Sequence, residues 1–166
     1  MQISDVVMLA EYNHGANERV LRRVVPLLPS ELHAPCSLSH GSLFQTLLHV
    51  VDAQWYWRLA CETGEAPARS LSESDVSGAP ELRELMRQED ARWIEFVRSI
   101  PEDKLVRPHS FHWAHAKPRT QLLWVLLMHA FNHGTHHQAE AGLRLGELGP
   151  PPGDIDFLIY ASRSRS

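Results

Sequence analysis

The sequence is poor in cysteine, in basic clusters and in long apolar runs, and each shortage excludes a class of protein. Only two residues are cysteines and no CxxC spacing occurs, which excludes a redox pair and a cysteine-rich zinc site. The formal net charge is −4 and the basic residues form no stripe, so nucleic acid is not an expected partner. No apolar run approaches the roughly 20 residues that span a bilayer, so no membrane association is expected.

The first residues also lack the features of a secretory leader. They include Asp5 and Glu11 and have no cationic start. We therefore expect a reduced, cytoplasmic protein. The length and the ordinary apolar content predict one domain over residues 1–166.

Strand-like alternation is nearly absent, and four long segments with helical periodicity dominate the chain. They run from about Ser4 to Leu28, Ser42 to Thr63, Pro80 to Ile100 and Thr120 to Leu145. Thr120 is the expected N-cap of the last segment and Gly146 its expected end. Beyond Gly146 the prolines argue against a helix, and DFLIY (156–160) is expected to pack as a short closing segment. The pattern predicts an all-α four-helix bundle, and its long connectors leave room for a crossover or a functional loop.

The stretch MHAFNHGTHHQAEAG (128–142) holds four of the eleven histidines. His129, His133 and His137 follow one another at intervals of four, so they share one helix face. That face is apolar at its start and acidic at Glu140, so we expect it to point into the bundle. Two inward imidazoles at this spacing can reach one ion, but Gly134 replaces the glutamate of HExxH, which excludes the zinc-protease motif. His129 and His137 compete as the partner of His133.

A third ligand must come from another helix, and His49 is the candidate. It lies within LLHVVDAQWYW (47–57), on a polar line that large apolar residues flank. Taken alone, His49 is most simply a core histidine, and an HxxxH pair is most simply a surface feature. Two inward histidine sites on two bundle helices together favour a metal site.

Several stretches resemble the DinB family of damage-inducible bacterial proteins, which is related to the YfiT-like metal-dependent hydrolases. They are YNHGANERVL (12–21), LLHVVDAQWYWRL (47–59) and LLMHAFNHGTHHQAEAGLRLGELG (126–149), in that order. The resemblance implies helices that run up-down-down-up, with a long crossover between the second and third. It also implies one divalent ion on His49, His133 and His137, with His129 outside the ligand set. The family often has His-Arg-Gly-Gln where this chain has 137–140, so substrate contacts are not carried over.

Three neutral imidazoles leave an open coordination position, which is typical of catalytic zinc sites. That position would hold water as a nucleophile or a thiol as thiolate. We expect Zn²⁺ or Ni²⁺, because imidazole suits both. The candidate catalytic residues are Asp52, Tyr56 and Glu140, with Gln45 as a further helper; Asp52 and Glu140 are also suited to orienting a histidine ring.

Two functions of different classes follow from this site. In the first, the protein is a metal-dependent enzyme, either a hydrolase or, as the resemblance implies for some relatives, an S-transferase that uses a small-molecule thiol. In the second, it is a non-catalytic metal-binding or stress-response bundle. The aromatic surplus on the long helices and the resemblance lead us to expect a homodimer.

Two further histidine groups have simpler interpretations. His136 lies about a quarter turn from the HxxxH pair and is expected to face a loop or solvent. The stretch HSFHWAHAK (109–117) directly precedes the last helix. We interpret it as a surface loop anchored by Trp113, with the mouth of a pocket as the alternative.

Overall fold

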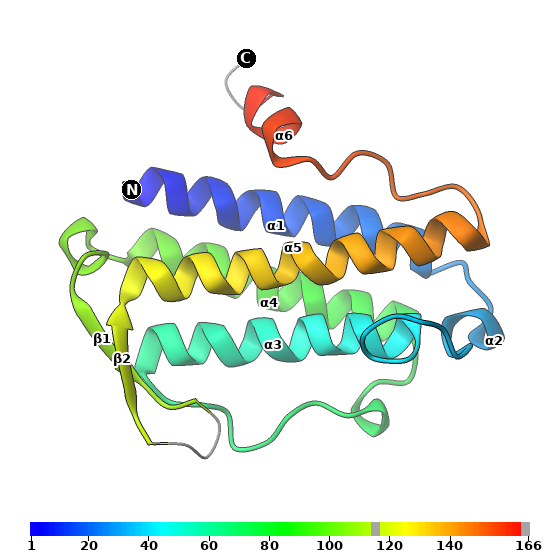
Figure 1. Cartoon of the computed structure of the whole chain (residues 1–166), viewed down its shortest axis with the longest axis horizontal. Coiled ribbons are helices and arrows are strands. Elements are labelled where there is room, and N and C mark those ends of the chain that lie inside the picture. Colours follow the sequence, from blue (N-terminus) through cyan, green and yellow to red (C-terminus); the bar gives the residue numbers. More distant parts are fainter. Residues whose placement is uncertain (114–116, 164–166) are drawn as a thin grey trace.

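The computed structural model describes residues 1–113 and 117–163, and four long helices form its body. They are α1 (Ile3–Val24), α3 (Leu43–Thr63), α4 (Ala79–Ser99) and α5 (Leu123–Leu148). Helices α1 and α5 run in one direction and α3 and α4 in the other, and the connector 64–78 crosses the length of the bundle between α3 and α4 (Figure 1). The expected four-helix bundle, with its up-down-down-up order and crossover, is confirmed.

Short elements lie in the connectors and at the C-terminal end. They are α2 (Pro29–Leu32), η1 (Glu73–Asp75), η2 (Glu102–Lys104), β1 (Pro108–Phe111), β2 (Arg119–Leu122) and α6 (Phe157–Arg163). Strands β1 and β2 pair antiparallel, with Pro108 opposite Leu122 and Phe111 opposite Arg119. This small hairpin was not predicted from the sequence.

The ends of α3 follow from its capping residues. The Ser42 hydroxyl accepts a hydrogen bond from the Gln45 amide at 3.1 Å, which satisfies a free donor of the first turn. Gly64 ends the helix in the left-handed conformation, with φ at +81°. Helix α1 ends at Val24 rather than at Leu28, because Pro26 has no N–H group to continue the helical hydrogen bonds.

Helix α5 differs from its predicted bounds at both ends. Thr120 is not an N-cap, because residues 119–122 pair with β1 and the helix begins only at Leu123. Gly146 does not end the helix, which continues to Leu148. Beyond the prolines, part of the expected closing segment forms the short helix α6.

The bundle interior consists of two apolar clusters with polar side chains between them. One cluster surrounds Trp93 near the hairpin, and the other surrounds Phe44 near the opposite end. In sequence, the buried polar residues of α1, α4 and α5 lie between the segments that feed the two clusters. They include Asn13, Asn17, Asp90, His137 and Gln138. In the described part of the chain, no helix combines the length and the apolar character needed to cross a membrane.

Replacing Gly64 with alanine should lower the free energy of unfolding by about 2–4 kcal/mol. The left-handed conformation costs about 1–2 kcal/mol for a residue with a Cβ atom, and forced backbone shifts cost about 1–3 kcal/mol. A Cβ atom at this position would lie 2.7 Å from the backbone oxygen of Ser110. Urea unfolding monitored by circular dichroism measures the change.

The matched control is Gly146→Ala, because Gly146 lies inside α5 and a Cβ atom there meets nothing within 4 Å. This variant should be as stable as the parent or up to about 1 kcal/mol more stable. Equal effects of the two substitutions would refute the role assigned to Gly64.

Candidate metal centre

The structure brings together the three histidines that the sequence singles out. His49 projects from α3, and His133 and His137 project from successive turns of α5, which packs against α3. The Nε2 atoms of His49 and His133 lie 3.3 Å apart. The ring centroid of His137 lies 4.6 Å from that of His133 and 4.8 Å from that of His49. Two nitrogens bound to one tetrahedral zinc ion, at bonds of about 2.0–2.1 Å, are about 3.3 Å apart, so the His49–His133 pair fits such an ion.

Glu140 fixes the orientation of the His137 ring. Its Oε2 atom lies 2.8 Å from Nδ1 of His137, one turn earlier on α5, and it also accepts a 2.8 Å hydrogen bond from the Ser39 hydroxyl. With Nδ1–H donating to the carboxylate, Nε2 keeps its lone pair for an ion. Burial raises the pKa of Glu140, but the hydrogen bonds from His137 and Ser39 outweigh it and hold that pKa below its usual value. Glu140 is therefore an ionised acceptor.

The environment keeps the imidazoles of His49 and His133 uncharged. Burial, together with the neighbouring imidazoles, lowers the pKa of His49 and of His133 from 6.5 to about 4. Both rings are therefore neutral near pH 7 and have a lone pair to offer. A group of neutral imidazoles that resists protonation fits a divalent cation of the zinc and nickel type.

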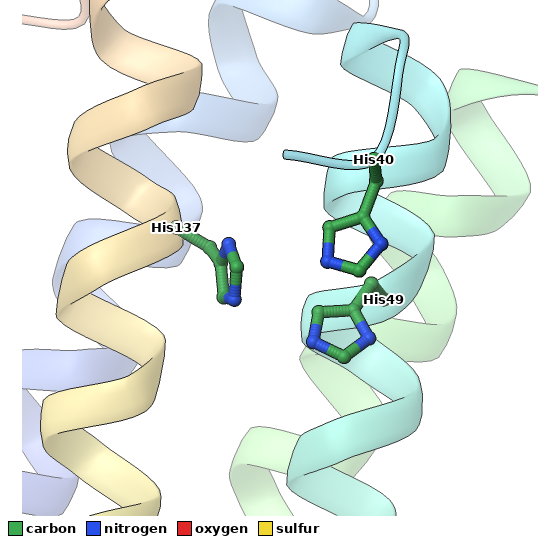
Figure 2. Close-up of side chains that lie close together, drawn as sticks. All are labelled: His40, His49 and His137. Atoms are coloured by element: carbon green, nitrogen blue, oxygen red, sulfur yellow. The ribbon is translucent and has the colours of Figure 1, made fainter. Parts of the chain in front are cut away.

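A fourth histidine, His40, joins the cluster from the connector before α3. Its ring stacks on that of His49, with centroids 3.9 Å apart, and stands edge-on to His137 at 5.2 Å. One possible ligand atom from each of His40, His49 and His137 can be chosen so that all lie within 4.8 Å of one another. Figure 2 shows His40 and His49 one above the other, facing His137. His40 was not predicted from the sequence, because no periodicity indicates where a loop residue points.

The candidate catalytic residues have different surroundings in the structure. Glu140 reaches the imidazole cluster, as described. The Asp52 carboxylate accepts a 2.7 Å hydrogen bond from the Leu71 amide and so holds the crossover against α3. The Tyr56 hydroxyl donates to the backbone oxygen of His112 at 2.7 Å, next to the hairpin. Gln45 is exposed in the first turn of α3.

The two remaining histidines of α5, His129 and His136, have different surroundings from the HxxxH pair. The His136 side chain is 66% exposed, whereas that of His137 is 7% exposed, so His136 lies largely in solvent as expected, with its Nε2 atom 3.9 Å from the Glu140 carboxylate. His129 is exposed and stands edge-on to Trp57, with centroids 4.5 Å apart. Its ring is 6.0 Å from that of His133, farther than His137 is, so the geometry favours His137 as the partner of His133.

The stretch 109–117 is only in part a loop. Its first residues belong to β1, and residues 114–116 lie outside the described residues. The His109 ring is 2.7 Å from the backbone oxygen of Ala60, which joins β1 to the end of α3. Trp113 packs edge-on against Trp57 at 5.1 Å and carries the guanidinium of Arg119 over its ring, so it anchors this segment as expected.

Lowering the pH from about 6.5 to about 4 should destabilise the metal-free protein. The unfolded chain binds protons at His49 and His133 near pH 6.5, whereas the folded chain binds them only near pH 4. Within this window the unfolded state holds more protons, so the free energy of unfolding falls as the pH falls. Urea unfolding in the presence of a chelator, at several pH values, measures this slope.

The variant carrying His49→Gln and His133→Gln should show a flatter dependence than the parent, and His136→Gln should not. A slope that is unchanged in the double variant would contradict the assignment of these protons.

Comparisons with known proteins agree with this architecture. The model of the DinB family matches residues 1–165. The protein DinB of Bacillus subtilis (strain 168) is 25% identical over 158 residues, which are 92% of this chain and 91% of the relative.

Two solved structures share the fold. A DinB-like protein of Bacillus subtilis superposes with a TM-score of 0.66 at 14% identity, over 88% of this chain and 92% of its own. YfiT of Bacillus subtilis, described as a probable metal-dependent hydrolase with an unusual four-helix bundle topology, gives a TM-score of 0.55 at 16% identity, over 83% and 86% of the two chains.

Proposed function

Because the chain belongs to the DinB family, we propose that it binds one divalent metal ion through His49, His133 and His137 and uses it in catalysis. The observation that supports this most directly is the 3.3 Å separation of the His49 and His133 Nε2 atoms, next to the His137 ring that Glu140 orients. The rings of His49 and His133 stand between α3 and α5, where burial disfavours their protonated forms. Zn²⁺ or Ni²⁺ is the proposed ion.

The residues around the ion have separate tasks. The three imidazoles hold the ion and leave a coordination position open. Glu140 accepts a hydrogen bond from Nδ1–H of His137 and so keeps Nε2 directed to the centre, and the Ser39 hydroxyl, which donates to Glu140, holds Glu140 in place. When bound, the ion supplies Lewis-acid chemistry: it lowers the pKa of a bound water or holds a thiol as thiolate.

The proposed reaction is therefore attack of that nucleophile on an electrophilic substrate. With water the reaction is a hydrolysis, a class supported by the description of the YfiT neighbour. With a small-molecule thiol it is an S-transfer. Both classes use the same open position.

The alternative is a bundle that binds the ion without turnover. One observation favours it: Asp52 and Tyr56, two of the three candidate catalytic side chains, make hydrogen bonds to the crossover and the hairpin segment. In that case the ion serves the structure alone.

Alanine in place of His49, His133 or His137 should remove most of the metal from untagged protein, because each loss leaves two imidazoles. His136→Ala should keep one equivalent, since its side chain points to solvent. Glu140→Gln should keep the ion but bind it about 10–100-fold more weakly. Elemental analysis and chelator competition measure these effects.

If His129→Ala removed the ion and His137→Ala did not, the ligand pair would be displaced by one helical turn. If all three alanine variants kept a full equivalent of metal, the site itself would be wrong.

Turnover distinguishes the enzyme from the non-catalytic bundle. Protein loaded with Zn²⁺ or Ni²⁺ should hydrolyse an activated ester or amide, or join a low-molecular-weight thiol to an electrophile, and His133→Ala protein treated in the same way should not. Equal background rates for the two proteins, both shown to be folded, would support the non-catalytic alternative.

A further inference from the structure

We infer that His40 faces the open coordination position and forms a hydrogen bond with the ligand held there, without binding the ion itself. The inference rests on the proposed function, because it assumes an ion on His49, His133 and His137. It adds a residue that lies on a loop, outside both ligand helices. The expected occupant is a small anionic ligand of the metal, such as hydroxide, a thiolate or a pseudohalide.

The orientation of the His40 ring differs from the orientations of the three proposed ligand rings. The rings of His49, His133 and His137 cross one another at 62°, 84° and 65°, as rings that bind one ion from different sides do. The His40 ring instead lies nearly parallel to that of His49, at 24°, and stacks on it at 3.9 Å. In Figure 2 the nitrogens of these two stacked rings lie side by side, so their lone pairs run alongside one another rather than crossing at one point.

The position of His40 nevertheless keeps it at the centre. One ring nitrogen of His40 and one of His49 are turned towards His137 across the gap between α3 and α5 (Figure 2). The ligand atoms of these three residues lie within 4.8 Å of one another. A neutral imidazole has one N–H donor and one acceptor nitrogen, so His40 can form a hydrogen bond with an atom bound to the ion.

The loop that carries His40 is held in place on both sides of it. The Cys36 amide donates to the oxygen of Gly41 at 2.8 Å, and the Gly41 amide donates to the oxygen of Leu38 at 2.9 Å. Gly41 has a φ of +81°, which a glycine adopts without strain. On the other side, the Ser39 hydroxyl bonds to Glu140. His40 is therefore fixed between α3 and α5 before any ligand arrives.

The test uses protein loaded with Co²⁺, whose visible spectrum reports both metal binding and the entry of a ligand. Azide serves as the probe anion, titrated into the parent, His40→Ala and His40→Gln. His136→Ala is the matched control, because it removes a nearby histidine whose side chain is 66% exposed. Circular dichroism confirms that each variant is folded.

His40→Ala should bind one equivalent of Co²⁺ with an affinity within about threefold of the parent, while its affinity for azide falls about tenfold, the size expected for one lost hydrogen bond. His40→Gln, which keeps a donor, should recover most of the azide affinity. His136→Ala should match the parent in both measurements.

Two outcomes would overturn the inference alone. If His40→Ala lost as much Co²⁺ affinity as His137→Ala, His40 would be a ligand. If its azide affinity equalled that of the parent, His40 would have no role at the open position. Failure of the parent protein to bind Co²⁺ would instead overturn the proposed function, and this inference with it.

Discussion

Buried hydrogen bonds between α1, α4 and α5 fix the relative positions of these helices, and the candidate metal centre depends on them. The Gln138 side-chain amide donates to Asn17 at 2.7 Å and lies 3.1 Å from the Asn13 oxygen, and Asn17 donates to Asp90 at 2.9 Å. Leaving one buried partner unsatisfied costs about 1–3 kcal/mol, so a shift of any of these helices along its axis is penalised. Gln138 directly follows His137, so the same bonds set the height at which the imidazoles of α5 meet α3.

The Asp90 carboxylate in this layer is hydrogen-bonded to two side chains of α1, His14 and Asn17. Burial raises the pKa of its carboxyl, and hydrogen bonds from His14 and Asn17 oppose that effect. His14 in turn has a raised pKa, chiefly because of its hydrogen bond to Asp90, and its Nδ1 atom lies 3.1 Å from that carboxylate. The layer therefore holds its ionisable groups in contact with one another, at the same level of the bundle as the uncharged imidazoles.

Packing also explains why the glutamate of HExxH is absent from α5. Gly134 lies against α1, and a Cβ atom there would come within 2.6 Å of the Asn13 side-chain oxygen. A larger residue at 134 would displace the Asn13 side chain and disturb its hydrogen bonds. The same Cβ atom would also lie 3.5 Å from the Gln54 side chain of α3, so a glutamate there would have to displace these two buried side chains.

Helical periodicity predicted the features that depend on a single helix. The directions of His49, His133 and His137 follow from their helix faces, and the ends of α3 follow from Ser42 and Gly64. Contacts between segments that are far apart in the sequence leave no such periodic or capping pattern. The pairing of β1 with β2 displaced the start of α5, and the closure of the loop at Gly41 placed His40 against His49. The ion, its assignment to His49, His133 and His137, and the homodimer stay predictions, because each depends on a partner outside the chain.

The two ligand helices are far apart in the sequence, and this separation has a consequence for the unfolded chain. His49 and His133 are 84 positions apart in the sequence, and the chain between them includes the crossover, all of α4 and the hairpin. An ion shared by these residues would act as a reversible cross-link that closes a long loop, and it would restrict the unfolded ensemble in the way a disulfide does. The protein would then resist unfolding most where free metal is available. Chelation would shorten the lifetime of the folded state without altering a covalent bond, and mutations that loosen the packing of α3 on α5 would weaken metal binding even far from the imidazoles.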